Sequence, residues 1–185
     1  MTDTTIPTAA AAEVLAFWIE AGPEKWFDKN AHFDSAFHAR FHDLHFAAAR
    51  QELTDWLNAP ESSLALLLLL DQFPRNCFRG TAHMYATDTL ALHYARDAIS
   101  RGHDETIDPE LRIFFYLPFM HSEELADQEL CCELCEPLGE RYLPFAIEHR
   151  DIVARFGRFP HRNDILLRET TAEERAFLDE GGFSG

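Results

Sequence analysis

Lysine is scarce in this sequence of 185 residues, which contains only Lys25 and Lys29 beside 14 Arg. Acidic residues number 32 against 16 basic ones, so the formal net charge is −16 at pH 7. A chain of this charge repels the phosphates of nucleic acid and the anionic surface of a membrane. We therefore expect neither nucleic acid nor a membrane among its partners.

The motifs of the common nucleotide-binding and hydrolase classes are also missing. The sequence has no G-x-G-x-x-G, no P-loop and no G-x-S-x-G, which are the patterns that place phosphates or a nucleophilic serine. No segment alternates apolar and polar residues with the period of two that is typical of a half-buried strand. We predict no cofactor and no β-sheet.

Cysteine is restricted to four residues, which do not form the spaced framework of a disulfide-rich domain: Cys77, Cys131, Cys132 and Cys135. The first residues lack a basic stretch followed by an apolar one, so we expect no signal peptide. These features predict a cytoplasmic protein with reduced thiols. Cys132-x-x-Cys135 has no second pair to complete a zinc site, and small buried cysteines on a helix explain it better.

The longest apolar run is Leu64–Leu70, and Asp71, Gln72, Arg75 and Asn76 follow it directly. The run has six Leu and no β-branched residue, which favours a helix. A helix that is apolar all round belongs at the centre of a packed domain. It is too short to span a membrane, which needs about 20 residues. Pro74 is expected to end or kink this helix.

The remaining sequence predicts further helices and a fold that is all-α. Phe33, Phe37, Phe41, Leu44 and Ala48 form one apolar stripe. The expected helices are 9–21, 31–53, 64–76, from after Gly80 to 100, 125–138, 144–156, and 171–178 after a capping box, with Ser62 or Ser63 capping the central one. We expect seven to nine helices in antiparallel pairs, in one domain over residues 9–183 that follows a frayed lead, 1–8.

Three polar clusters each follow strongly apolar sequence. They are Asp71, Gln72, Arg75 and Asn76; His121, Ser122 and Glu123; and Arg155, Arg158, His161, Arg162 and Asn163. The third lies in a stretch, residues 141–168, that has six Arg against three acidic residues. If helices pack antiparallel, the ends of several can meet, and the clusters then form one site. The alternative is a structural network in which Arg binds terminal carbonyls and Asp71 neutralises Arg75.

Histidines recur at His38, His42 and His45, at the i, i+4 and i+7 positions of one predicted helix. Two His four residues apart can bind a metal ion, but a zinc-protease helix also needs a Glu that this segment lacks. We expect these side chains on a boundary or solvated face and predict no metal site.

The motifs resemble a known family of bacterial proteins, domain of unknown function 924. The resemblance is carried by LALLLLLDQFPRNCFRG, IFFYLPFMHSEELADQE, IVARFGRFPHRNDILLRE, VLAFWIE and WFDKNAHFD. It implies a single all-helical domain similar to the tetratricopeptide-repeat superfamily, and it implies no reaction. A loose recurrence around Pro74, Pro118 and Pro160, 44 and 42 residues apart, agrees with a helical repeat. Cys77 and Leu167 depart from the pattern of the family.

Two functions remain open at this point. In the first, an Arg- and His-lined pocket binds a small anion, a metabolite carboxylate or a peptide terminus. Its ligand-binding residues would be Gln72, Arg75, Asn76, Arg155, Arg158, Arg162 and Asn163. In the second, the protein is a hydrolase or transferase acting on an anionic substrate, and its acid–base residues would be His121, His161, Glu123 and Asp71. We favour the first, because no nucleophile or metal ligand set is evident.

Overall fold

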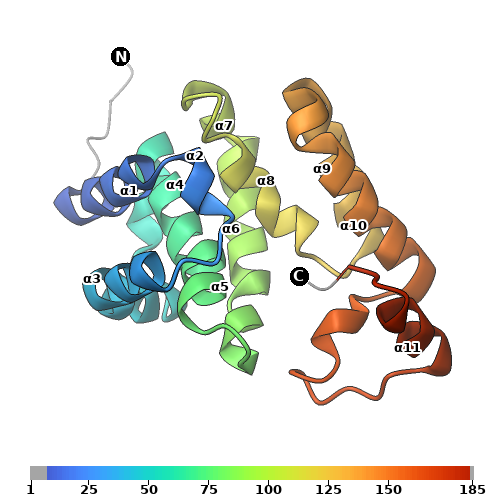
Figure 1. The fold of residues 1–185 in the computed structure, drawn as a ribbon. Coiled ribbons are helices and arrows are strands. Elements are labelled where there is room, and N and C mark those ends of the chain that lie inside the picture. The colour runs from blue at the N-terminus through green and yellow to red at the C-terminus, as the bar shows by residue number, and fades with distance from the viewer. Residues whose placement is uncertain (1–7, 184–185) are drawn as a thin grey trace. The chain divides into compact units, whose positions relative to one another are not determined.

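The computed structural model describes residues 8–183, and every regular element within that range is a helix (Figure 1). The prediction of an all-α fold is therefore confirmed. No helix in this range is long and apolar enough to cross a membrane. The predicted lead, 1–8, falls almost wholly outside the described range, and Thr8 caps the first helix.

The helices of the first half are α1 (Ala9–Ala21), α2 (Pro23–Trp26), α3 (Ala31–Ala49), η1 (Thr54–Asn58), α4 (Pro60–Leu67), η2 (Leu68–Gln72), α5 (Phe73–Cys77), η3 (Ala82–Tyr85), α6 (Asp88–Ser100) and α7 (His103–Thr106). Those of the second half are α8 (Ile113–Met120), α9 (Leu125–Cys135), η4 (Glu136–Arg141), α10 (Leu143–Phe156), η5 (Pro160–Arg162) and α11 (Ala172–Asp179). The predicted bounds of the first helix are confirmed.

The chain divides into two compact units, and α8 runs from one into the other. Unit 1 comprises residues 1–79 and 83–118, and unit 2 comprises 80–82 and 119–185. A single domain over 9–183 stays a prediction, as does its likeness to a tetratricopeptide repeat.

The centre of unit 1 is the leucine run, as predicted. Every side chain from Ser62 to Pro74 is buried. Helix α4 packs against α1, α6 and α7, while η2 packs against α3 and α6. Ser62 and Ser63 do not cap this helix, because Pro60 occupies its first turn and Ala59 is the N-cap. The hydroxyl of Ser62 instead donates to the carbonyl of Trp56 at 2.6 Å.

Aromatic rings fill the space between α1 and α3. Phe17 stacks on Phe33 and Phe37 with ring centroids 5.1 and 5.3 Å apart. The apolar stripe of α3 is confirmed with one change, because the buried residue near its end is His45 rather than the half-buried Leu44. The expectation that His45 faces a boundary or solvent is therefore wrong.

Helix α3 ends four residues earlier than the predicted 53. The amide of Gln51 donates to the carbonyl of Ala48, and that of Glu52 donates to Ala47. This pair of bonds is a Schellman motif, which needs a left-handed residue and usually takes glycine there. Gln51 occupies that position with φ 62°. Because the usual glycine is missing, the sequence carried no sign of this end.

Unit 2 contains α9 and α10, which pack on each other and are joined by η4 (Figure 1). Cys131 and Cys135 lie on the buried face of α9, and Cys132 is half-buried. The interpretation of Cys132-x-x-Cys135 as small buried cysteines is therefore confirmed for Cys135 and not for Cys132. Helix α10 ends at Gly157, whose φ of 69° gives the left-handed turn typical of a helix C-terminus. The predicted irregular segment after it contains only η5. Helix α11 then begins with the predicted capping box of Thr171 and Glu174.

Candidate functional site

The first predicted cluster lies in unit 1, where Pro74 changes the helix rather than ending it. Proline has no N–H, and its ring crowds the carbonyl four residues earlier. The chain accommodates it by widening into the π-helical segment η2, in which the amide of Phe73 donates to Leu68, five residues back. The helix then continues as α5. Such π-turns often lie at functional sites.

The widened turn leaves backbone carbonyls without helical donors, and side chains supply the missing hydrogen bonds. Nδ1 of His45 donates to the carbonyl of Leu69 at 2.8 Å. The hydroxyl of Thr87 donates to the carbonyl of Leu70 at 2.5 Å. Helix α3 and the N-terminus of α6 are therefore both attached to the same buried turn.

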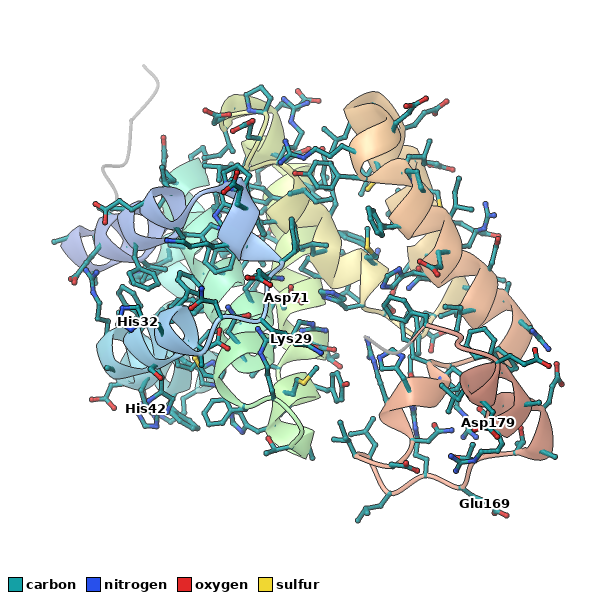
Figure 2. All side chains as sticks on the ribbon, in the orientation of Figure 1. Lys29, His32, His42, Asp71, Glu169 and Asp179 are labelled. Carbon is teal, nitrogen blue, oxygen red and sulfur yellow. The ribbon has the colours of Figure 1, made fainter. Side chains whose placement is uncertain are left out.

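The charged residues of this cluster pair with one another. Asp71, which Figure 2 labels, is 1% exposed, and its carboxylate accepts from Gln72 at 2.6 Å and lies 3.2 Å from the Arg75 guanidinium. Arg75 also donates two bonds to Asp88, at 2.8 and 2.9 Å. Burial alone would lower the pKa of Arg75, but Asp71 and Asp88 raise it above its ordinary value.

The geometry of the first cluster thus supports the structural alternative. Arg75 also donates to the carbonyl of Asp71 at 2.9 Å, as expected of a residue that closes a helix end. Its guanidinium is already matched by two carboxylates, so it is a poor ligand for a further anion. Asn76 is 7% exposed, and its side-chain Nδ2 makes no hydrogen bond. The roles predicted for Asp71, Gln72, Arg75 and Asn76 stay predictions.

A histidine pair, which the sequence did not indicate, lies next to this turn. Nε2 of His45 lies 2.8 Å from Nε2 of His83. Because Nδ1 of His45 donates to Leu69, its Nε2 accepts and His83 is the donor. Burial lowers the pKa of His45 to about 4, although the bond to Leu69 opposes this shift. The two rings lie 38 residues apart in sequence, so helical spacing cannot reveal the pair.

The second and third clusters meet within unit 2, whereas the union of all three clusters in one site stays a prediction. The link is Glu123, whose carboxylate accepts two bonds from Arg168, at 2.7 and 2.9 Å. It also accepts the backbone amide of Phe159 at 2.8 Å. Burial opposes ionisation of Glu123, but the bonds from Arg168 and Phe159 hold its pKa below the ordinary value. A carboxylate engaged in this way is a weak candidate for orienting a catalytic histidine.

A second carboxylate, Glu174, fixes the other side of the same segment. It accepts two bonds from Arg158, at 2.6 and 2.8 Å, and one from the amide of Thr171 at 2.7 Å. Asn163 adds a longer contact of 3.3 Å. These bonds, above all those from Arg158, hold the pKa of Glu174 at about 2. Arg158 and Asn163 therefore serve the capping of α11, and their predicted role in ligand binding stays untested.

Arg155 lies at the edge of this arrangement. Its guanidinium pairs with Glu173 at 3.0 Å, and both side chains are more than half exposed. It also lies 4.6 Å from the ring centroid of Phe156. An exposed pair of this kind contributes about 0–1 kcal/mol to stability.

The rings of His149 and His161 pack on the same two aromatic side chains, Phe159 and Phe183. His149 lies 5.5 and 4.5 Å from these ring centroids, and His161 lies 5.6 and 5.2 Å from them. The Arg162 guanidinium lies 4.4 Å from the Phe159 centroid. Two imidazoles and a guanidinium thus surround one buried phenyl ring.

The charge environment of His161 is unusual. Its pKa is lowered to about 3, mainly by burial and also by Arg162, His149 and His121, whereas Glu123 opposes the shift. Its Nδ1 atom is buried and makes no hydrogen bond. The backbone carbonyl of His121 accepts from Arg162 at 3.0 Å, which brings His121 into the same group.

The sequence and the fold are both similar to those of known proteins. Residues 14–182 match the family described as "Bacterial protein of unknown function (DUF924)". The chain belongs to this family. A solved structure titled "Structure of Protein of Unknown Function ATU0120 from Agrobacterium tumefaciens" is 66% identical and superposes with a TM-score of 0.92, covering 94% of this chain and 98% of that one. No curated protein matches.

The predicted resemblance to DUF924 is thus confirmed, and the match covers every residue of the three clusters. In the described range of this DUF924 protein, no group of three or more His, Cys, Asp or Glu has the geometry to hold a metal ion. Sequence reasoning missed two residues that contact the second and third clusters in unit 2, His149 and Arg168. His149 follows Ala146 and precedes Ile152 at intervals of three on α10, which marks it as buried. Arg168 lies in the counted basic stretch but outside the cluster.

Proposed function

We propose that this DUF924 protein binds a small anion, a carboxylate or phosphate group, at the unit 2 group of His121, His149, His161 and Arg162. The observation that carries the proposal is the environment of His161. A buried polar atom is nearly always hydrogen-bonded in a native protein. The Nδ1 atom of His161 is an exception, and the positive charge of Arg162 acts on the same ring.

Electrostatics favour a negative ligand here. Burial contributes most to the low pKa of His161, and Arg162, His149 and His121 also make it harder for the ring to take up a proton, whereas Glu123 opposes them. The same potential that disfavours a second positive charge favours an anion, and low local dielectric strengthens both effects. An arginine and a neutral imidazole N–H are suitable donors to carboxylate or phosphate oxygens.

The pairing pattern separates the arginines into two groups. Arg158 and Arg168 each donate two bonds to one carboxylate, Glu174 and Glu123 respectively. These two guanidinium groups stabilise the segment around η5, and the N–H donor pair of each is already engaged by a carboxylate. Arg162 forms the other group, because its guanidinium donates to the backbone carbonyl of His121 at 3.0 Å.

Binding is better supported than catalysis. A general acid or base works best with a pKa near the working pH. The pKa of His161 is about 3, so the ring is neutral at pH 7 and is a weak base. Glu123 raises this pKa, but its carboxylate is engaged by Arg168 and the pKa stays well below neutrality. The hydrolase or transferase alternative therefore lacks an activated acid–base group. The composition agrees with a cytoplasmic protein that binds metabolites or peptide termini.

Calorimetric titration with inorganic phosphate and with citrate tests the proposal. Wild-type protein should bind one of these anions, and Arg162→Gln should weaken binding at least about tenfold, since a charge-assisted bond contributes about 1.5–3 kcal/mol. Arg155→Gln is the matched control. Arg155 is a nearby arginine of unit 2, and its ion pair with Glu173 lies outside the proposed binding group. Equal affinities of the two variants, with thermal unfolding confirming that both fold, would refute the proposal.

A further inference from the structure

Unit 1 has a small surface cavity that lies outside all three polar clusters. Its volume is about 140 Å³, and it is lined by Ile19, Pro23, Trp26, Asp108, Glu110 and Leu111. Ile19 comes from the end of α1, Pro23 and Trp26 from α2, and the others from the segment between α7 and α8. A cavity of about 150 Å³ holds one benzene molecule, so this one has room for a single side chain or a small organic ion.

The apolar wall of the cavity is rigid. The indole N–H of Trp26 donates to the carbonyl of Trp18 at 2.7 Å. The Trp26 ring stacks on that of Trp18 with an interplanar angle of 2° and meets Phe114 edge-on at 5.2 Å. Leu111 is 6% exposed and completes this wall. Because the Trp26 side chain is fixed on three sides, the cavity is formed before any ligand arrives.

The rim of the cavity has negative charge. Asp108 and Glu110 are both exposed, and the amide of Glu110 donates to the Asp108 carboxylate at 2.9 Å, which holds the turn. Arg112, two residues after Glu110, donates to the backbone carbonyls of Asp104 and Glu105. The cavity thus has an indole wall, aliphatic sides and carboxylates at its mouth.

We propose that this cavity binds a protonated primary amine on a short aliphatic stem. The stem would lie against Trp26, Leu111 and the half-exposed Ile19, as the methylenes of lysine do on apolar surfaces. The ammonium would lie near Asp108 and Glu110, and tryptophan is the aromatic side chain that attracts cations most strongly. The site takes a cation and lies in unit 1, so it is independent of the proposed anion site.

The test uses n-butylammonium as the probe, followed through the indole N–H resonance of Trp26 in two-dimensional NMR. The sequence has three Trp, so the indole region is readily resolved. At about 0.4–0.8 kcal/mol per heavy atom, which lies within the range for small ligands, five heavy atoms give affinities of about 1–30 mM. We expect a saturable shift of the Trp26 resonance in that range, weakened by added salt.

1-Butanol is the control ligand, because it has the same stem without the charge. We expect it to bind at least about fivefold more weakly, and Asp108→Asn and Glu110→Gln each to weaken butylammonium about two- to fivefold. Asp55→Asn, an exposed acidic residue of unit 1 outside the cavity lining, should have no effect. Equal binding of butanol and butylammonium, or no saturable shift at Trp26, would overturn the proposal.

A second arm separates the sources of such an amine. Nα-acetyl-lysine methylamide carries the same ammonium and stem on a peptide backbone. If it shifts Trp26 as butylammonium does, the cavity accommodates a lysine side chain of a partner protein. If butylammonium alone shifts Trp26, the ligand is a free alkylamine. Both results support the amine site, and the absence of both shifts contradicts it.

Discussion

The hydroxyl of Thr87 takes over the hydrogen bond that Pro74 cannot make. In a regular helix the residue at position 74 would donate to the carbonyl of Leu70, and proline has no N–H. Thr87 reaches that carbonyl from the start of α6 at 2.5 Å. The most buried segment of unit 1 therefore depends on a donor from another helix.

Thr87→Val should lower the free energy of unfolding by about 1–3 kcal/mol, because it keeps the shape of the side chain and leaves a buried carbonyl without a donor. Chemical denaturation measures the loss. Thr54→Val is the control, since the Thr54 hydroxyl also donates to a backbone carbonyl, that of Gln51, but is exposed. The account is contradicted if the two substitutions cost the same.

Glu123→Gln should destabilise the protein by about 2 kcal/mol. The substitution leaves the Arg168 guanidinium, about three-quarters buried, without its two charged bonds. Glu173→Gln removes a comparable ion pair at the exposed Arg155 and should cost no more than about 1 kcal/mol. Thermal unfolding compares the pair. Similar losses of stability in the two variants would contradict a special structural role for the Glu123 hydrogen bonds.

The helices were largely predictable, because apolar spacing and caps are local signals. The run at Leu64 and the capping box at Thr171 were read directly from the sequence. The π-turn at Pro74 was not, since its donors come from His45 and Thr87, which no local pattern connects to it.

Long-range pairing also limited what could be predicted of the site. The two clusters of unit 2 were recognised because each follows an apolar stretch. The two clusters are held together by the ion pair of Glu123 and Arg168. These residues lie 45 positions apart, so their pairing produces no periodic pattern in the sequence. His161 was named as a candidate from its cluster, whereas its low pKa follows mainly from burial, which no local pattern shows.

Leu167→Gly should stabilise the protein by about 1 kcal/mol. Leu167 has φ 54° and is 93% exposed, at a turn where Arg168 donates to Asn163 and Leu167 to Asp164. This left-handed position favours glycine, which has no β-carbon to crowd the backbone. Leu167→Ala removes the same exposed apolar surface but keeps the β-carbon, so it should bring no gain. A gain from alanine equal to that from glycine would assign the effect to surface hydrophobicity.

Stability should fall in mild acid because of His45. The folded protein protonates His45 only near pH 4, whereas the unfolded chain does so near 6.5. The unfolded state therefore binds the proton first, and stability is greatest above 6.5 and decreases as the pH falls from 6.5 to 4, by about 3 kcal/mol at most.

His45→Gln isolates this contribution, because its amide can still donate to Leu69 and does not titrate. The difference in unfolding free energy between wild type and His45→Gln should shrink as the pH is lowered from 7.5 to about 5. Denaturation curves at several pH values measure it. A difference that does not change with pH would rule out a neutral His45 in the folded state.

The central claim is that the group around His161 accepts an anion, and NMR titration of the His161 imidazole tests it most directly. A negative ligand beside the ring stabilises its protonated form, so the pKa of His161 should rise from about 3 when phosphate or citrate is bound. Chloride at matched ionic strength gives the reference curve. We predict a rise in wild-type protein that is lost in Arg162→Gln and retained in Arg155→Gln. An unchanged His161 titration at saturating anion would contradict the account.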